Sequence, residues 1–234
     1  LSNLPSGRTF LNFTASHDGI GVRPLEDVLS RRDVDFLVEA AQARGGQVST
    51  KRNPDGSDSH YELNITYFDA LGSPDSPRDK SRVARFLCSQ MVPLALRGIP
   101  ALYFNSLVAG KNWHEGVKET GRARTINRQK WDAETLEDLL RDRENEGGAV
   151  FRCITQALAI RREQPAFHPD APQKVLRLGD EVFAVERAAS DGGQSIAAIS
   201  NFCNRRVTIA LDERIPCLAG AKEITDLLGR RTFG

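Results

Sequence analysis

Hydrophobic and polar positions along the first part of the chain predict strands and helices in turn. A short apolar run at 10–13 is followed by His17 and Asp18 and then by the flexible segment Gly19–Gly21. A strand that ends in an imidazole and a carboxylate, with glycine to turn the chain away, is typical of the C-terminal face of a parallel α/β barrel. We therefore expect residues 1–18 to supply a barrel strand that presents both side chains at that face.

Four later segments carry apolar residues at helical spacing. They are expected to form helices at 33–44, from 76 to just before Gly98, at 133–143 and at 148–163. Ser76 is expected to cap the second of these helices, with Pro77 at its first position. The apolar run at 99–104 has the length of a strand, so the order strand, insertion, helix, strand indicates an α/β unit.

The connection between the first strand and the second helix is much longer than most. About sixty residues separate Asp18 from Ser76, whereas such connections usually take roughly 2 to 6 residues. The stretch at 51–59 within it is polar and rich in turn-forming residues. We expect residues 19–75 to form an inserted lid subdomain over the site.

From about residue 165 the pattern changes to short β-rich runs separated by turn signals. The runs lie at 175–178, 182–185, 196–199 and 207–211. Such regular spacing predicts a small antiparallel sheet. The sequence thus indicates an α/β fold, the C-terminal portion of a (β/α)8 barrel. Its expected parts are a strand at 1–18, a lid at 19–75, the last barrel strand and helices at 76–165, and an antiparallel β domain at 166–234.

Charge and cysteine content narrow the classes of function. The chain has 32 basic and 31 acidic residues, and this net charge of +1 sets up no field that would attract nucleic acid or an acidic membrane. A small polar substrate fits better. Cys88, Cys153, Cys203 and Cys217 show no CxxC spacing, which favours reduced thiols, a cytoplasmic location and no metal. No apolar stretch approaches the roughly 18 residues of a membrane-spanning helix.

Several segments match conserved motifs of one enzyme family, in that family's order. They are NFTASHDGIG at 12–21, YELNITYFDAL at 61–71, GIPALYF at 98–104, and AGKN at 109–112 leading to GRARTINR at 121–128. The first resembles the fourth conserved region of the α-amylase superfamily, glycoside hydrolase family 13, in the form found in the sucrose phosphorylase group. NPDGS at 53–57 and Trp113 resemble the glucosylglycerate phosphorylase branch of that group. The resemblance covers residues 8 to about 165 well, and the β domain only in outline.

The resemblance implies a retaining double displacement. A carboxylate nucleophile takes the glucosyl group while an acid protonates the leaving oxygen, and phosphate then releases α-glucose 1-phosphate. In the family, the nucleophile and the acid/base lie upstream of anything in this chain. The chain is then expected to be the C-terminal part of a larger enzyme and to be inactive alone. Inorganic phosphate would be a co-substrate, and no cofactor or metal is expected.

The resemblance also assigns roles to residues of the donor site. Asp18 is expected to bind two adjacent hydroxyls of the glucose, and His17 to contact the same ring. Arg124 matches the family arginine that reaches the glucose, and Thr125 stands where sucrose phosphorylases carry an aspartate. Further positive charge, of use in attracting phosphate, comes from Arg122, Arg128 and Lys130.

The acceptor side of the predicted site differs from that of sucrose phosphorylases. Tyr61 and Glu62 match the end of a mobile loop that alternates there between fructose and phosphate, and Glu62 stands where glutamine is usual. An acceptor with a carboxylate, such as glycerate, would need cations from Lys51, Arg52 or Lys111. Fructose, fructose 6-phosphate and glycerate remain open as acceptors.

Other interpretations have different consequences. A metal-dependent phosphohydrolase of the HD type would need a further histidine on a helix, and His60, His114 and His168 are expected in loops. A hydrolase or transglucosidase of the same superfamily would share the glucose-binding motifs, and a non-catalytic carbohydrate-binding fragment is a third possibility. Two barrel strands alone leave sheet edges uncovered, so we expect self-association or docking onto a missing N-terminal half.

Overall fold

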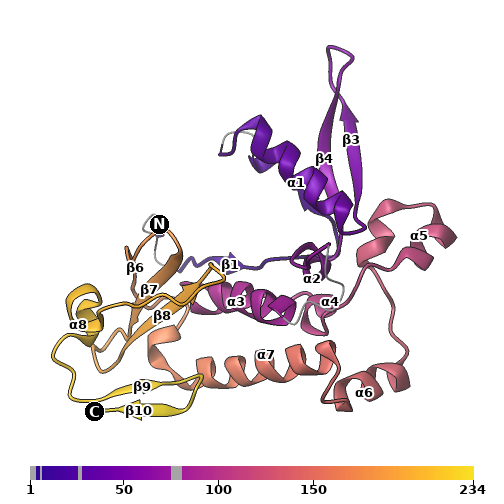
Figure 1. The fold of residues 1–234 in the computed structure, drawn as a ribbon. Helices are drawn as coiled ribbons and strands as arrows, with labels where there is room; N and C mark the ends of the chain where they lie inside the picture. The colour runs from indigo at the N-terminus through magenta and orange to yellow at the C-terminus, as the bar shows by residue number, and fades with distance from the viewer. Residues whose placement is uncertain (1–3, 6, 26–27, 75–80) are drawn as a thin grey trace. The chain divides into compact units, whose positions relative to one another are not determined.

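A computed structural model describes residues 4–5, 7–25, 28–74 and 81–234 of the chain (Figure 1). The fold is mixed α/β with small sheets. The chain forms two compact units, each made of several segments. The first unit comprises residues 1–13, 87–101 and 153–234, and the second comprises residues 14–86 and 102–152. The division predicted from the sequence into four consecutive parts stays a prediction.

The first unit contains a parallel pair of very short strands. Strand β1 (Leu11–Asn12) pairs with β5 (Ile99–Pro100). Gly98 leads into β5 with φ +122°, and a Cβ there would lie 2.6 Å from the carbonyl oxygen of Phe10. Only glycine therefore allows the two strands to meet at this point. A strand over 99–104 is wrong beyond Pro100, because Phe104 begins helix α4 (Phe104–Leu107); a short apolar run does not distinguish strand from helix by its period.

An antiparallel sheet forms the C-terminal part of the first unit. Strands β6 (Gln173–Leu176), β7 (Val182–Ala188) and β8 (Ser195–Asn201) lie in the order β6-β7-β8. Strands β7 and β8 confirm the runs at 182–185 and 196–199, whereas β6 includes only residues 175 and 176 of the run at 175–178. The buried core of this part consists of Leu176, Leu178, Val182, Ala184 and Ile215.

The run at 207–211 is not a strand. Val207 and Ile209 pack against the buried core without joining the sheet, and Leu211 begins helix α8 (Leu211–Arg214). Alternating apolar residues show that one face is buried, but they do not supply a partner strand. A hairpin of β9 (Ile224–Asp226) and β10 (Arg231–Phe233) lies farther along the chain, where no run of residues predicted a strand.

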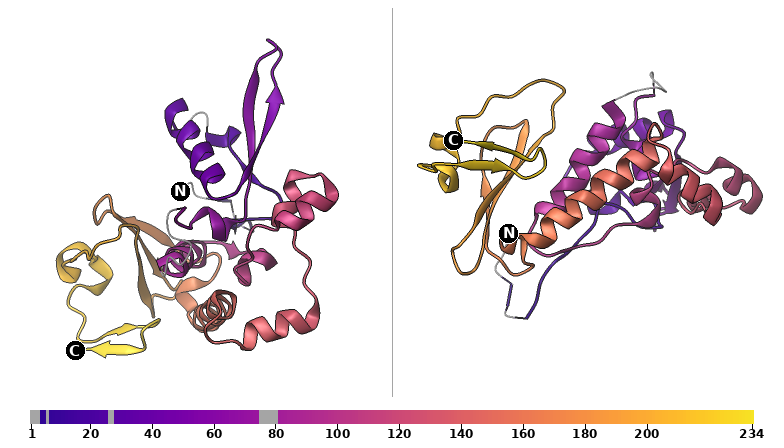
Figure 2. Two further views of the ribbon diagram at one scale, coloured as in Figure 1. Left: turned by 45° about the vertical axis from the view of Figure 1, so that its right-hand side comes forward. Right: turned by 90° about the horizontal axis from the view of Figure 1, so that it is seen from below.

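The second unit contains a three-stranded antiparallel sheet beside a helix. Strands β2 (Ile20–Gly21), β4 (Asp58–Asn64) and β3 (Gln47–Arg52) lie in the order β2-β4-β3. Helix α1 (Arg31–Ala43) covers it and starts with a capping box between Ser30 and Asp33. The shared core consists of Val22, Val38, Ala41, Leu63 and Ile65. In Figure 1 and the left view of Figure 2, the β3–β4 hairpin extends beyond α1.

Two segments of this region are more regular than the sequence indicated. The polar stretch at 51–59 contains the turn between β3 and β4 at 53–57, and the ends of the two strands extend into it on either side. The segment expected to be flexible at Gly19–Gly21 includes strand β2, which pairs with Leu63 and Glu62 of β4. The polar, turn-rich composition therefore indicated the turn of the hairpin and did not indicate the strands on either side of it.

The long helices follow the amphipathic pattern. Helices α1, α6 (Ala133–Arg141) and α7 (Glu146–Glu163) confirm three of the expected helices, and α3 (Ser81–Ala95) confirms the described part of the fourth. Its expected cap at Ser76 and Pro77 lies outside the described residues. The short helices are η1 (Arg23–Leu25), α2 (Tyr67–Ala70), α5 (His114–Thr120), η2 (Ala123–Asn127), η3 (Pro165–Phe167) and η4 (Pro216–Leu218). No helix within the described ranges has the length and hydrophobicity needed to cross a bilayer.

Candidate functional site

Asp18 lies in the loop between β1 and β2, among three basic side chains. Its Oδ1 accepts a hydrogen bond of 2.9 Å from Nη2 of Arg128. Nη1 of Arg124 lies 3.7 Å from the same oxygen, and Nε2 of His17 lies 3.6 Å from it. The Asp18 side chain is 41% exposed, so solutes can reach it. The structure therefore brings together three residues predicted for the donor site and adds Arg128 as the nearest cation.

The loop that carries Asp18 is bound through its backbone. Nε of Arg128 donates to the carbonyl of His17 over 3.0 Å. Nδ2 of Asn127 donates to the carbonyls of Ser16 and Asp18, over 2.8 and 3.0 Å. Both of these donors lie at the end of η2, far along the chain from the loop. Arg128 was predicted from the sequence only as added charge, and Asn127 was not predicted.

Arg124 is oriented by a buried carboxylate. Its Nε donates to Oε2 of Glu62 over 2.8 Å, and the Glu62 side chain is 6% exposed against 43% for Arg124. This hydrogen bond, together with the negative charge of Glu62, raises the pKa of Arg124 above its ordinary value. The exposed guanidinium is thus held in one orientation by a buried carboxylate partner.

Gly19 makes the approach of Glu62 possible. A Cβ at Gly19 would lie 2.6 Å from Cγ of Glu62 and 2.5 Å from the carbonyl oxygen of Leu63. No real Cβ tolerates such contacts, so strand β4 can pass this close only when residue 19 is glycine. The glycine that follows His17 and Asp18 is therefore required by packing.

A buried hydrogen-bond network fixes the residues behind η2. Oη of Tyr103 donates to the carbonyl of Asn127 over 2.6 Å, and Nδ2 of Asn105 donates to the same oxygen over 3.3 Å. Oδ1 of Asn105 accepts from Nε1 of Trp131 over 2.7 Å. Burial raises the pKa of Tyr103, so its phenol remains a hydrogen-bond donor. None of these three residues was predicted, because an isolated Tyr, Asn or Trp carries no sequence signal for such a role.

Two of the predicted residues lie elsewhere or face another way. Tyr61, the neighbour of Glu62 on β4, is 39% exposed while Glu62 is buried, as expected for successive residues of a strand. Nζ of Lys111 lies 3.0 Å from Oε2 of Glu146, in a cluster with Arg82 rather than with Asp18. Burial works to raise the pKa of Glu146, but hydrogen bonds and charges from Lys111 and Arg82 outweigh it and lower the pKa.

Thr125 pairs with another hydroxyl. Its Oγ1 lies 2.8 Å from Oγ1 of Thr120, at the end of α5. This contact is between neutral groups. The charged residue next to it, Arg124, donates to Glu62.

Two of the three histidines that were expected in loops lie in regular elements. His60 lies on strand β4, His114 begins helix α5, and only His168 follows a short helix in a loop. Among the described residues, no group of three or more His, Cys, Asp or Glu is gathered as a metal site. The geometry around His17 and Asp18 is that of an ion-pair cluster with arginines.

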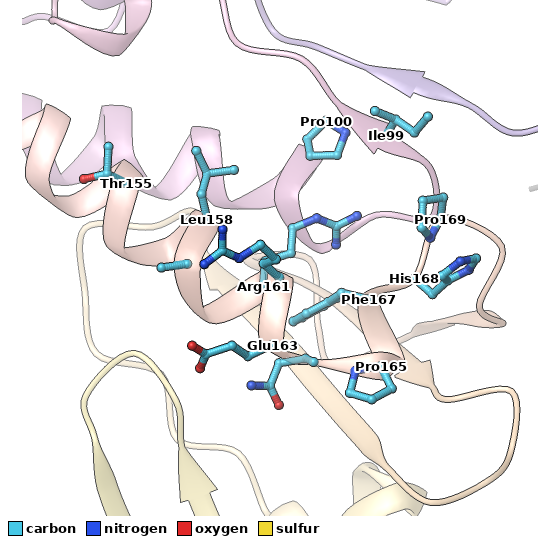
Figure 3. A pocket seen from close by; sticks show the side chains of 13 residues that line it. Ile99, Pro100, Thr155, Leu158, Arg161, Glu163, Pro165, Phe167, His168 and Pro169 are labelled. Carbon is cyan, nitrogen blue, oxygen red and sulfur yellow. The ribbon is translucent and has the colours of Figure 1, made fainter.

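A pocket of about 740 Å³ lies in the first unit (Figure 3). It is lined by Ile99 of β5, Arg161 of α7, and Phe167 with His168 after it, and by none of the predicted site residues. The guanidinium of Arg161 donates to the carbonyls of Leu94 and Gly98 over 2.8 and 2.9 Å, so its role here is to bind backbone. The pocket therefore has a mostly apolar wall and a cation already satisfied by the backbone.

Comparisons with known proteins identify relatives of the chain. No family model matches it. The chain is 42% identical to the glucosylglycerate phosphorylase of Spirochaeta thermophila over 82% of its own length and 32% of that protein. It is 24% identical to the sucrose phosphorylase of Streptococcus mutans over 80% of its own length and 36% of that protein. The chain spans about a third of the length of these curated relatives.

A solved structure shares the fold. The crystal structure of sucrose 6F-phosphate phosphorylase from Thermoanaerobacter thermosaccharolyticum matches with a TM-score of 0.67 at 22% identity, over 82% of this chain and 36% of that one. At this identity the match concerns the fold alone. The arrangement of helices and small sheets described above is thus also present in an experimentally determined protein.

Proposed function

Because this chain is a homologue of the glucosylglycerate and sucrose phosphorylases and corresponds to a C-terminal segment of them, we propose that it is part of a retaining glucoside phosphorylase. The donor that we propose is glucosylglycerate, with inorganic phosphate as co-substrate and no cofactor. The observation that carries this choice is the identity of 38–42% to glucosylglycerate phosphorylases, against 24–31% to sucrose phosphorylases.

The proposed reaction proceeds in two displacements at the anomeric carbon. First, the bond from this carbon to the leaving oxygen breaks, a carboxylate nucleophile bonds to the carbon, and an acid gives its proton to the leaving oxygen. Phosphate then bonds to the carbon, the carboxylate leaves, and the proton of phosphate returns to the acid/base residue. The product is α-glucose 1-phosphate. The nucleophile and the acid/base belong, on this proposal, to the part of the protein outside this chain.

The proposed role of this chain is to hold the glucosyl group through Asp18 and His17. An ionised carboxylate can accept from two sugar hydroxyls at once, and an imidazole can donate. These contacts strengthen as positive charge develops at the anomeric carbon. The cluster of Arg128 and Arg124 supports the proposal, because it keeps Asp18 oriented while its side chain stays 41% exposed.

The proposed architecture of the whole protein is a (β/α)8 barrel with an insertion and a terminal β domain. The parallel pairing of β1 with β5 supports it, since a parallel pair requires a long crossover between its strands. The crossover here includes helix α3, as in an α/β unit. We propose that further parallel strands, supplied by the remaining part of the protein, continue this sheet on both sides.

The acceptor that we propose, glycerate, needs a cation to bind its carboxylate. Of the three cations considered for glycerate, Arg52 lies 3.3 Å from Asp58 and Lys111 lies 3.0 Å from Glu146, so each already has a carboxylate partner. Lys51 is exposed and forms no ion pair with the residues that the structure describes. Replacing the three singly in the complete protein should lower the glycerate-dependent rate most for Lys51→Ala, and equal rates for all three would remove this hypothesis.

The test of the proposed function is an assay of the complete protein that contains this chain. Phosphate is supplied with glucosylglycerate, sucrose or sucrose 6-phosphate in turn, and the release of glucose 1-phosphate is followed. We expect the highest kcat/KM with glucosylglycerate. Release of free glucose at a rate independent of phosphate would instead indicate a hydrolase of the same superfamily.

The chain of 234 residues serves as a second sample in the same assay. We expect it to release no glucose 1-phosphate from any of the three donors, because the proposal places the nucleophile and the acid/base elsewhere. Phosphorolysis by this chain alone would contradict that assignment. Sucrose as the preferred donor of the complete protein would keep the reaction and change the acceptor.

A further inference from the structure

The Asp18 loop is bound to η2 at three successive carbonyls. Nδ2 of Asn127 donates to the carbonyls of Ser16 and Asp18, and Nε of Arg128 donates to that of His17. Arg128 also binds the Asp18 carboxylate. Two adjacent residues of one segment therefore hold both the backbone and the side chain of the proposed sugar-binding loop.

Asn127 is itself fixed from behind. The residue is 4% exposed, and its carbonyl accepts from Tyr103 and Asn105, over 2.6 and 3.3 Å. Asn105 is held in turn by Trp131. Because both hydrogens on Nδ2 have partners, rotation of this side chain would break two partly buried hydrogen bonds, and the bonds to its carbonyl hold the backbone of the residue in place.

We propose that Asn127 is a positioning residue, which sets the place of the Asp18 carboxylate relative to the Arg128 guanidinium. This inference rests on the proposed function, because it concerns the same site. An NH₂ group carries two hydrogens on one atom and can bridge two carbonyls that lie two residues apart. A side chain with one donor or none leaves at least one of these carbonyls without its partner.

Loss of the Asn127 side chain is expected to affect the transition state more than the ground state. Asp18 would bind the sugar hydroxyls more strongly in the transition state than in the ground state. Loss of the amide lets the loop shift while Arg128 can still pair with the carboxylate. Binding of substrate is then little changed, whereas the alignment needed in the transition state is lost, so kcat falls more than KM rises.

The test uses Asn127→Ala in the complete protein with two measurements. We expect kcat for glucose 1-phosphate formation to fall about tenfold, since small misplacements have large kinetic effects, with KM changed by less than about threefold. Backbone hydrogen exchange of residues 14–19, followed by mass spectrometry, should become faster. The exchange measurement needs no catalytic activity.

Asn112→Ala is the matched control. The Asn112 side chain also holds backbone within the second unit, donating to the carbonyl of Arg44 over 3.0 Å and accepting from the N–H of Thr66 over 2.9 Å. Its loss should speed exchange near residues 44 and 66 and leave residues 14–19 unchanged. We expect kcat to stay within about twofold of the wild type.

The outcomes separate this inference from the proposed function. A wild-type protein without phosphorolysis overturns the proposed function, even if exchange at 14–19 responds to Asn127→Ala. An active wild type whose kcat is unaffected by Asn127→Ala, or unchanged exchange at 14–19, overturns the positioning role. If Asn127→Ala fails to fold, Tyr103→Phe removes one hydrogen bond to the Asn127 carbonyl instead, and the absence of any change in exchange at 14–19 then decides against the inference.

Discussion

Arginines fill opposite roles in the two units. Around Asp18, the guanidinium groups of Arg124 and Arg128 are 43% and 39% exposed and face carboxylates. In the first unit, Arg187 is fully buried and donates to backbone carbonyls, one of them that of Ala95 at the end of α3. In the first arrangement the guanidinium groups are accessible to a solute. In the second, the guanidinium group donates hydrogen bonds to backbone carbonyls, including one at the end of a helix.

The pKa of an arginine also differs between these two surroundings. Burial, with the nearby charges of Arg161 and Arg97, lowers the pKa of Arg187 to about 10. A hydrogen bond to Glu62 raises the pKa of Arg124 instead. An arginine that is buried against carbonyls contributes to stability, whereas one that is exposed and paired with an acid is available for binding. We expect substitutions in the two regions to separate activity from stability.

The largest effect is expected at Asp18. In the complete protein, Asp18→Asn should lower kcat/KM for phosphorolysis by about a thousandfold, because an amide cannot supply the negative charge that stabilises the transition state. The melting temperature should change little, since the side chain is half-exposed. Steady-state kinetics and thermal unfolding on the same preparation check both parts. Unchanged activity would remove Asp18 from the site.

Arg187→Met should affect stability and not the chemistry. It removes the guanidinium donor from the carbonyls of Ala95, His168, Ala171 and Pro172, of which those of His168 and Pro172 keep a backbone N–H donor, and should lower the free energy of unfolding by about 3 kcal/mol. Urea unfolding measures the loss. Arg206→Met, at an exposed arginine, should change stability by less than about 0.5 kcal/mol. Equal effects of the two substitutions would contradict the structural role of Arg187.

Gly19→Ala tests whether packing or flexibility requires glycine beside Asp18. The added Cβ would lie within 2.6 Å of both Glu62 and Leu63, so we expect a loss of roughly 2 kcal/mol in stability and a displaced Glu62–Arg124 pair. Gly21→Ala is the control, because a Cβ there meets only Pro24 at 3.8 Å. Chemical unfolding should show the difference. If Gly21→Ala is as destabilising as Gly19→Ala, close packing is not the reason for the glycine.

The smallest effect is expected from Glu146, through its dependence on pH. Its pKa in the folded protein is lowered below the ordinary 4.5, so the unfolded chain binds more protons in this range. The stabilisation is fully present above pH 4.5 and is lost as the pH falls through the lowered pKa. Glu146→Gln should be less stable at neutral pH and lose less stability on acidification. Glu119→Gln, at an exposed glutamate, should follow the wild type in melting temperature across the same range.

The regular elements were largely readable from the sequence where they carry an amphipathic repeat. The patterns at 133–143 and 148–163 predicted α6 and α7 to within a few residues. The runs at 99–104 and 207–211 were predicted as strands, and most of their residues are not in strands. A short apolar run shows only that a segment is buried. Whether such a segment becomes a strand depends on a partner, which 99–100 has in β1 and 207–211 lacks among the described strands.

The candidate site was predictable in its residue types and not in its contacts. His17, Asp18, Arg124 and Glu62 were singled out by motif, and the structure brings them together. Lys111 was singled out in the same way and pairs with Glu146 instead. A motif marks which side chains carry chemistry, but the pairing of charges depends on distances that the motif does not contain.

The sequence by itself determined the chemical groups of this protein and the local periodicities that make its helices, since both are properties of neighbouring residues. The tertiary structure decided which groups meet. Arg128 and Asp18 lie 110 residues apart in the chain and 2.9 Å apart in space, and Asn127 reaches the same loop across a similar separation. Such contacts arise only when β4, η2 and the loop after β1 pack together, because helical and strand periods carry no information about partners that distant.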